Sequence, residues 1–241
     1  MQSPIQPLTE SRKNRLATNL AAIRERIDHA ARAAGRRGAD VRLVAVTKEV
    51  PEEVITALLE LGIDAIGENR PEIIWKKQAA IPEPVPWHMI GHFQRNKIDR
   101  ALPHIHMVHS VHSMDLLGSL DARLGRLAAR SPLPVLLQIN VSGEISKQGF
   151  RLEEAPHAAD LAGALNRLKF SGFMTMAPAD ANDAQLHEIF GRLRELRESV
   201  GRDRAPELSM GMSSDFEVAV EEGATMVRIG SALFGGLDFE R

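Results

Sequence analysis

The sequence predicts an α/β protein, a single (β/α)8 barrel of the TIM type with an extra N-terminal helix. Eight short apolar segments occur along the 241 residues, and most are followed by a segment with helical spacing. These apolar segments are rich in Val, Ile and Leu without clean alternation, as parallel strands buried on both faces require. Eight such units in this length match the size of a barrel, whereas an open doubly wound sheet seldom needs eight.

The N-terminal helix is expected over about residues 8–35, because Leu16, Leu20, Ile23 and Ile27 have helical spacing. The barrel is expected over about residues 41–236, with strands at 42–48, 64–69, 85–91, 107–111, 134–141, 170–176, 208–212 and 225–230. Helices are expected to begin near 51 and 71 and to cover 93–102, 114–130, 153–168, 183–200, 214–223 and 231–235. No linker rich in Pro, Gly or Ser interrupts this order, so residues 1–241 are predicted to form one domain.

The composition is that of an ordinary globular protein, with 44% hydrophobic residues, 26% charged residues and a net charge of -2. A basic footprint for nucleic acid is absent, and no apolar run is long enough to span a bilayer. The N-terminus lacks the apolar segment of a secretory signal, and the absence of cysteine excludes disulfides and thiolate chemistry. We therefore expect a cytoplasmic protein without a membrane or nucleic-acid partner. A monomer is expected, because a barrel needs no partner to complete its core.

Polar or small residues follow the apolar strands at the ends where barrels place their functional sites. These strand-end residues are Lys48, Asn69, Gly91, His92, Ser110, Asn140, Thr175, Ser213, Gly230 and Ser231. Taken alone, Lys48 is explained as the point where a strand reaches solvent, because lysine is mostly exposed. Its occurrence within this set makes it a candidate site residue.

The last two units have the features of an anion-binding loop pair. Residues 214–217 fit a capping box that opens a helix, which leaves Ser213 facing the strand end. Gly230 and Ser231 lie where a strand turns into a short helix, whose free N–H groups would point at a ligand. Barrels frequently hold phosphate with the loops after strands 7 and 8. Each motif alone is also explained by ordinary turn and capping residues, but the two together, at the expected strand positions, favour phosphate.

A strand-end lysine combined with a phosphate site indicates pyridoxal 5′-phosphate (PLP), which offers an aldehyde for a lysine Schiff base, a pyridine ring and a phosphate. Arg228 lies inside the expected eighth strand, where a guanidinium must be paired or hydrogen-bonded. It is either a structural arginine tied to a carboxylate or a ligand contact near the ring nitrogen. Because a guanidinium only donates hydrogen bonds, the second role would keep the nitrogen unprotonated and weaken the ring as an electron sink.

Seven segments together resemble the pyridoxal phosphate homeostasis proteins (the YggS/PROSC family) from about residue 10 to 236: AVTKEVP, AIGEN, WHMIGHFQRNK, VHSV, LLQINVSGEISKQGF, GFMTMAP and LSMGMSSDFEVAVEEGATMVRIGSALFG. The resemblance implies the barrel of the alanine racemase N-terminal domain and PLP held as a Schiff base on Lys48. It further implies phosphate contacts from Ser213, Gly230 and Ser231. Near the ring it implies Arg228 beside the nitrogen, Asn69 as a polar contact and Met210 packed against it. Arg70 departs from the family, which often has an aromatic residue there; this argues against a ring-packing or interface role at the position and leaves the Lys48 assignment unchanged.

The same resemblance implies a non-enzymatic PLP-binding protein of intracellular PLP (vitamin B6) homeostasis, with delivery to apo forms of PLP enzymes as a further role. The alternative is a PLP-dependent amino-acid racemase of fold type III. Two-base racemisation needs a second acid or base across the cofactor, and in alanine racemases a tyrosine fills that role. This chain has no tyrosine, although a histidine could substitute in principle. No catalytic residue is therefore assigned.

Two further features carry hypotheses of their own. Lys147 in EISKQGF is either part of the mouth through which the cofactor enters or a solvated loop lysine. Six of the nine histidines lie between residues 88 and 112, yet no metal site is expected. His88 and His92 straddle a strand and a helix start, so their rings should not converge on one ion.

Overall fold

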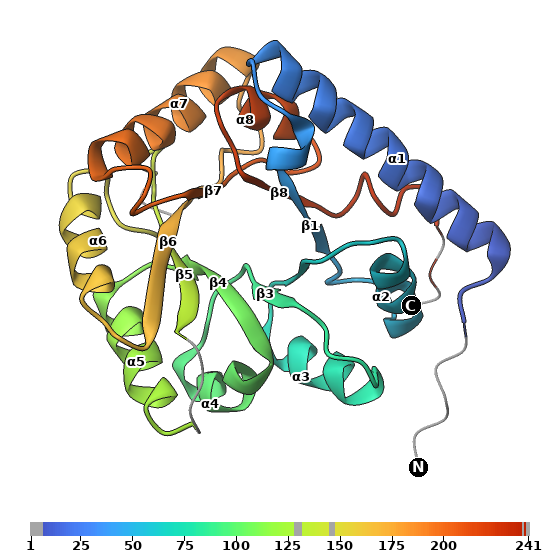
Figure 1. Cartoon of the computed structure of the whole chain (residues 1–241), viewed down its shortest axis with the longest axis horizontal. Coiled ribbons are helices and arrows are strands. Elements are labelled where there is room, and N and C mark those ends of the chain that lie inside the picture. Colours follow the sequence, from blue (N-terminus) through green and yellow to red (C-terminus); the bar gives the residue numbers. More distant parts are fainter. Residues whose placement is uncertain (1–6, 128–131, 145–147, 238, 240–241) are drawn as a thin grey trace.

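Eight parallel strands close into a barrel in chain order in the computed structural model, which describes residues 7–127, 132–144, 148–237 and 239 (Figure 1). The strands are β1 (Arg42–Val46), β2 (Ile66–Glu68), β3 (Trp87–Met89), β4 (Ile105–Val111), β5 (Leu133–Gln138), β6 (Leu168–Met174), β7 (Glu207–Ser209) and β8 (Met226–Ile229). Pairing of β8 with β1, from Arg42 opposite Met226 to Ala45 opposite Ile229, closes the ring. The predicted TIM-type barrel is confirmed.

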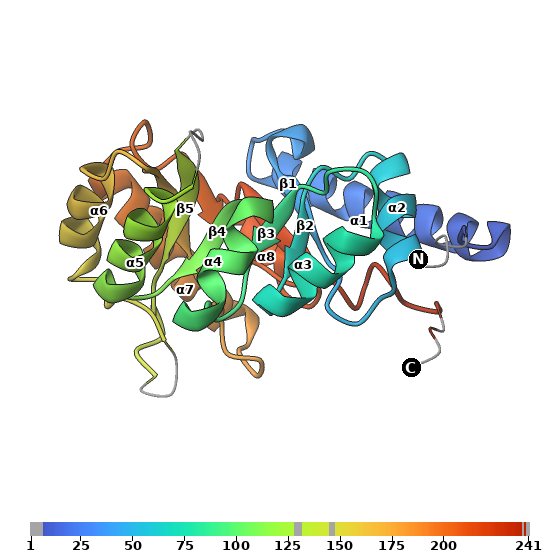
Figure 2. The ribbon, with the colours of Figure 1, turned by 90° about the horizontal axis from the view of Figure 1, so that it is seen from below.

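The α-helices surround the barrel and follow the strands in alternation. They are α1 (Glu10–Ala33), α2 (Glu52–Glu60), α3 (Pro71–Ala80), α4 (Ile98–Ala101), α5 (Met114–Leu124), α6 (Ala155–Gly163), α7 (Asp183–Val200) and α8 (Phe216–Glu221). In Figure 2, α3, α4 and α5 succeed one another along the outside of β2 to β5. The extra helix α1 runs along α8, where Arg26 donates to both carboxylate oxygens of Glu217 at 2.9 and 2.7 Å.

Two apolar layers follow from the pleat of the strands, which sends successive side chains to opposite faces. The smaller layer lies inside the barrel and consists of Val44, Ala65, Met107, Leu136, Met174 and Met226. The larger layer lies between strands and helices and includes the predicted buried face of α1. The polar strand-end side chains therefore lie above this apolar cluster.

Several local predictions need correction. The expected helix at 93–102 is reduced to α4 after a short 3-10 turn, and residues 231–235 form turns rather than a helix. The capping box predicted at 214–217 is wrong, because α8 begins at Phe216 with Asp215 before it and no side-chain cap. The Asp215 carboxylate instead accepts from the backbone N–H of Met212, which closes a tight loop. By contrast, α7 has the predicted bounds, with Asn182 and Gln185 forming a capping box.

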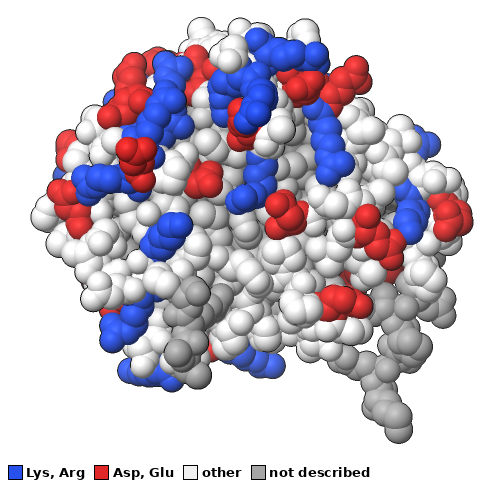
Figure 3. Space-filling view, viewed as in Figure 1, with Lys and Arg blue, Asp and Glu red and all other residues white. Residues whose placement is uncertain are grey.

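Charged side chains are mixed over the face seen in Figure 3, with Lys and Arg beside Asp and Glu rather than gathered by sign. This face therefore lacks the single-sign stripe that a nucleic-acid backbone requires. Among the described residues, no helix combines the length and the apolar character that crossing a membrane would need.

Candidate functional site

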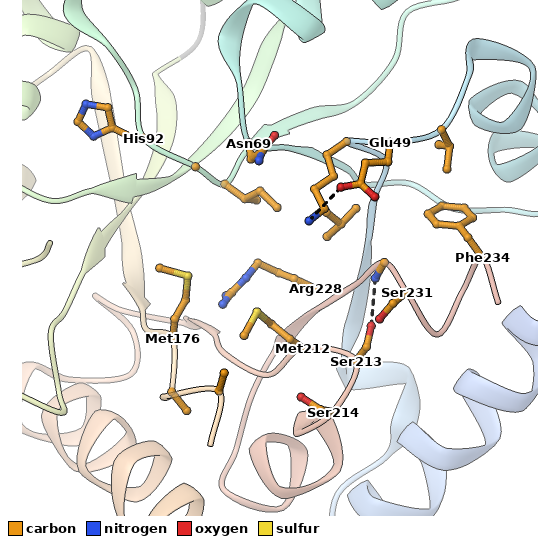
Figure 4. Close-up of a pocket in the computed structure, with 18 of the residues that line it drawn as sticks. Glu49, Asn69, His92, Met176, Met212, Ser213, Ser214, Arg228, Ser231 and Phe234 are labelled. Carbon is orange, nitrogen blue, oxygen red and sulfur yellow. Dashed lines mark hydrogen bonds and ion pairs between the residues drawn. The ribbon is translucent and has the colours of Figure 1, made fainter. Parts of the chain in front are cut away.

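A cavity of about 1540 Å³ opens at the carboxyl ends of the strands (Figure 4). Six of the seven predicted site residues line it: Lys48, Asn69, Ser213, Arg228, Gly230 and Ser231. They come from the ends of β1, β2, β7 and β8, which are far apart in sequence and meet only because the barrel closes between β8 and β1. The predicted strand-end residues therefore form one site rather than scattered surface positions.

Lys48 lies two residues beyond β1 and has a half-exposed side chain. Its amine forms an ion pair with Glu49 at 3.6 Å, the contact dashed beside Glu49 in Figure 4. The Lys48 side chain is 49% exposed and the Glu49 side chain 78%, so solvent screens this pair. The amine is thus weakly held and free to react with a ligand.

A buried ion pair fixes the backbone directly before Lys48. The Lys77 amine on α3 donates to Glu68 Oε1 at 2.8 Å and to the Thr47 carbonyl at 2.7 Å. The Thr47 hydroxyl donates to the same Glu68 oxygen at 2.7 Å. Sequence reasoning missed this group, although Lys77 follows the buried Ile74 at helical spacing, on the face that packs against the barrel.

The phosphate end consists of two loops joined by one hydroxyl group. Ser213 Oγ accepts from the backbone N–H groups of Gly230 and Ala232, both at 3.3 Å (Figure 4). Glycine is required at 211, because its φ is +93° and a Cβ there would lie 2.7 Å from the Ala219 Cβ. The Gly230 and Ala232 N–H groups therefore point at Ser213 Oγ rather than at a ligand as expected from the sequence, and Ser213 and Ser231 are the hydroxyl-bearing residues that these loops bring to the cavity.

Arg228 lies on β8 with its side chain inside the barrel and is only 4% exposed. Its guanidinium donates to the Ser209 carbonyl at 2.8 Å, to the Ser209 hydroxyl at 2.7 Å and to the Thr175 carbonyl at 2.9 Å. Burial lowers the pKa of Arg228 to about 10, so it remains charged at neutral pH. These three hydrogen-bond acceptors are all uncharged, and the carboxylate that interacts with Arg228 through its charge is that of Asp215, which partly counters the effect of burial on the Arg228 pKa.

Asn69 offers an unused polar atom to the cavity. Its Oδ1 is buried and has no hydrogen-bond partner among the described residues, which is costly unless a ligand or water supplies a donor. The end of β2 also packs tightly on β3, since a Cβ at Gly91 would lie 2.3 Å from the Asn69 carbonyl oxygen. The backbone of Asn69 is thereby held at the rim of the cavity.

Met210, predicted to pack by a ligand ring, does not line the cavity. The preceding residue, Ser209, points into the barrel, where it bonds Arg228, so the pleat sends Met210 outward into the core between strands and helices. Met176 and Met212 line the cavity instead (Figure 4). The motif identified the strand end, but only its register shows which methionine faces the ligand.

The remaining sequence hypotheses concern Lys147, Arg70 and the histidines. Lys147 lies outside the described residues. Arg70 precedes α3 and is not part of the cavity lining. Among the described residues, no group of three or more His, Cys, Asp or Glu side chains is arranged to hold a metal ion.

Comparison with known proteins gives a consistent result. The sequence profile described as "Alanine racemase, N-terminal domain" matches residues 18–238. A protein of Pseudomonas aeruginosa named "Pyridoxal phosphate homeostasis protein" is 41% identical, with 93% of this chain and 96% of that protein covered. A crystal structure of an unknown protein from Bifidobacterium adolescentis is 32% identical, with a TM-score of 0.88 and 96% and 98% of the two chains covered. PipY of Synechococcus elongatus PCC7942, solved with PLP bound, is 31% identical, with a TM-score of 0.77 and coverage of 91% and 100%.

Proposed function

The chain belongs to the pyridoxal phosphate homeostasis proteins within the alanine racemase N-terminal domain family, and from this membership we propose that it binds PLP as a Schiff base on Lys48. Its role is non-enzymatic: it holds PLP for intracellular vitamin B6 homeostasis and delivers it to apo forms of PLP enzymes. The observation that carries the proposal is that one cavity is lined by an accessible lysine, an arginine hydrogen-bonded only to the uncharged acceptors described above and a two-loop anion site.

Each chemical part of PLP has a matching group in the cavity. The Lys48 amine suits the aldehyde, and the hydroxyl groups of Ser213 and Ser231, with the backbone of Gly230 beside them, suit the phosphate. Arg228 donates to the ring nitrogen, and Asn69 Oδ1 accepts from a polar group on the ring, which satisfies its buried oxygen. Bound PLP supplies a reactive aldehyde and an electron-withdrawing ring.

Arg228 favours carriage over catalysis. A guanidinium cannot accept a proton, and at a pKa of about 10 it stays charged at neutral pH, so it holds the ring nitrogen in its unprotonated form. An unprotonated ring withdraws electrons less well, which limits racemisation, decarboxylation and transamination. The racemase alternative would need His92, which also lines the cavity, as the second acid or base, because the sequence contains no tyrosine.

The deciding experiment is an absorbance titration of the purified protein with PLP. We expect a band near ~420 nm that borohydride converts into a stable adduct on Lys48, as a lysine Schiff base requires. Lys48→Ala should lack the band, whereas Lys76→Ala, which removes an exposed lysine of α3, should keep it. A wild-type protein without the band at saturating PLP would sink the proposal. Chiral analysis after incubation with L-alanine then separates carrier from racemase, because D-alanine formation would establish the racemase.

We extend the proposal to organisation and partners. Residues 1–241 act as one domain and as a monomer, since all eight strands of the closed barrel come from one chain. The expected location is the cytoplasm, where the apo-enzymes of the proposed role are made. Size-exclusion chromatography with light scattering checks the monomer, and a mass of two chains would contradict it. Transfer to an apo-enzyme is checked by the rate at which that enzyme gains activity from the loaded protein, compared with an equal concentration of free PLP.

A further inference from the structure

A chain of four hydrogen-bonded side chains crosses the barrel interior below the cavity. His88 Nδ1 lies 2.9 Å from His109 Nε2, and His109 Nδ1 lies 2.8 Å from Ser209 Oγ. Ser209 Oγ in turn accepts from Arg228 Nη1 at 2.7 Å. The four residues come from β3, β4, β7 and β8, and none is more than 5% exposed. The chain therefore ends at the arginine that lines the cavity.

Both histidines in this chain are neutral. Burial lowers the pKa of His88 to about 3, and it lowers the pKa of His109 well below the ordinary value. A neutral imidazole has one donor and one acceptor nitrogen, so each junction of the chain holds a single hydrogen. The guanidinium only donates, which makes Ser209 Oγ an acceptor at the Arg228 end in either tautomer of His109.

Neutral partners hold Arg228 differently from a carboxylate. They fix the direction of its N–H groups without cancelling its charge, and His109 in turn fixes the Ser209 hydroxyl. Removal of His109 would leave the serine hydroxyl free to rotate about its own bond. Arg228 would keep the Ser209 and Thr175 carbonyls but lose a fixed hydroxyl acceptor, and it would donate less well to an acceptor in the cavity, because hydrogen bonds weaken steeply with misalignment.

We propose that His109, acting through Ser209, is a positioning residue that aligns Arg228 with the ring nitrogen of PLP and thereby sets the affinity and the absorption spectrum of the bound cofactor. His88 orients His109 from the far side of the barrel. Neither histidine lines the cavity, so both act without touching PLP. The inference rests on the proposed function and adds to it the residues that hold the ring end of the site.

Variants of the chain test the proposal on the full-length protein. Ser209→Ala and His109→Leu should each weaken PLP binding about 10-fold, the loss expected for a misaligned hydrogen bond to a charged group, and both should shift the absorption maximum in the same direction. The double variant should bind no worse than the weaker single one, because both changes break one chain. His109→Gln, which keeps a donor and an acceptor, should restore part of the affinity. His106→Leu, an exposed histidine on the same strand, should change neither readout.

Other readouts separate positioning from simple packing and from failure of the proposed function. In the apo-protein, nitrogen NMR should show His109 neutral at pH 7, with signals that move in Ser209→Ala. If the variants melt at a lower temperature but keep the wild-type PLP affinity and spectrum, the hydrogen-bonded residues contribute to stability alone, and the inference is wrong. The inference would equally fail if Ser209→Ala left the His109 signals where they are in the wild type. Absence of PLP binding by the wild type would overturn the proposed function as well, so the two failures are distinguishable.

Discussion

Replacing Lys77 with methionine is expected to destabilise the protein strongly, because it leaves a buried carboxylate without its charged partner. Lys77 and Glu68 form an ion pair of 2.8 Å whose side chains are 9% and 0% exposed. After the substitution, Glu68 keeps only the Thr47 hydroxyl, and its Oε2 already lacks a partner among the described residues. Methionine preserves most of the side-chain volume, so the effect measures charge rather than a cavity.

The expected loss of stability follows from the free-energy cost of leaving one charge of a buried ion pair without its partner. Removing one partner of a buried ion pair costs about 3–5 kcal/mol. For a chain of this size, each kcal/mol lowers Tm by about 2–4 °C, so Lys77→Met should melt about 6–20 °C below the wild type. The Thr47 carbonyl also loses its donor directly before Lys48, so the variant should form the Schiff base more slowly at temperatures where it is folded.

Thermal and urea unfolding of the apo-protein provide the assay, with two comparison variants. Lys76→Met changes the exposed neighbour on the same helix and should stay within about 0.5 kcal/mol of the wild type. Lys77→Met combined with Glu68→Gln removes the stranded charge and should recover part of the loss. If Lys77→Met and Lys76→Met melted at the same temperature, or if Glu68→Gln deepened the loss additively, the buried pair would not have the role inferred from its contacts.

Three other predictions follow from the described contacts. Asn19→Ala removes an amide that donates at 3.0 and 2.9 Å to two carbonyls of the loop after β8, and it should weaken PLP binding about 3- to 10-fold, whereas Arg24→Ala on the same helix should leave it unchanged in a binding titration. Burial lowers the pKa of His88 to about 3, so as the pH falls the unfolded chain protonates this histidine before the folded protein does. The free energy of unfolding, measured in urea, should therefore fall by up to about 1.4 kcal/mol per pH unit between pH 6.5 and pH 3. In His88→Asn the free energy of unfolding should depend less steeply on pH. Gly91→Ala would place a Cβ 2.3 Å from a carbonyl oxygen of the residue that follows β2 and should lower both stability and PLP affinity, while Gly118→Ala, with open space around it, should lower neither.

The fold was predictable because its main signal is local. Strands buried on both faces read as continuous apolar runs, and the helical spacing of residues 183–200 predicted the observed bounds of α7. The failures occur where packing decides. The region after Phe93 forms only a short helix, and the carboxylate of Asp215 bonds back to Met212 rather than capping α8. A sequence pattern does not show which of several possible hydrogen-bond partners a side chain takes in the folded protein.

The site was predictable to the level of strand ends but not of side-chain directions. Lys48, Asn69 and Arg228 follow or lie within apolar runs, so the barrel brings them together by topology alone. The prediction that Met210 packs against the ligand ring was wrong, because a shift of one residue along a strand decides whether a side chain points into or out of the barrel. The pairs Lys77–Glu68 and His109–Ser209 have no local signature, since each member reads as an ordinary polar residue until the fold places the paired atoms at 2.8 Å.

The two ends of the site are fixed to different degrees, which bears on how a carrier releases its cargo. Arg228 is 4% exposed and held by three hydrogen bonds, whereas the Lys48 side chain is 49% exposed and its ion pair is with a solvent-screened carboxylate. PLP bound as proposed would be anchored at its ring and phosphate while its covalent end stays open to water or an incoming amine. In the proposed transfer, a lysine of an acceptor enzyme would reach that end without displacing the phosphate from its loops. An arrangement built for catalysis would instead exclude water from the reacting carbon, so an open lysine end in the PLP-bound protein would favour the proposed carrier role independently of the ring-nitrogen argument.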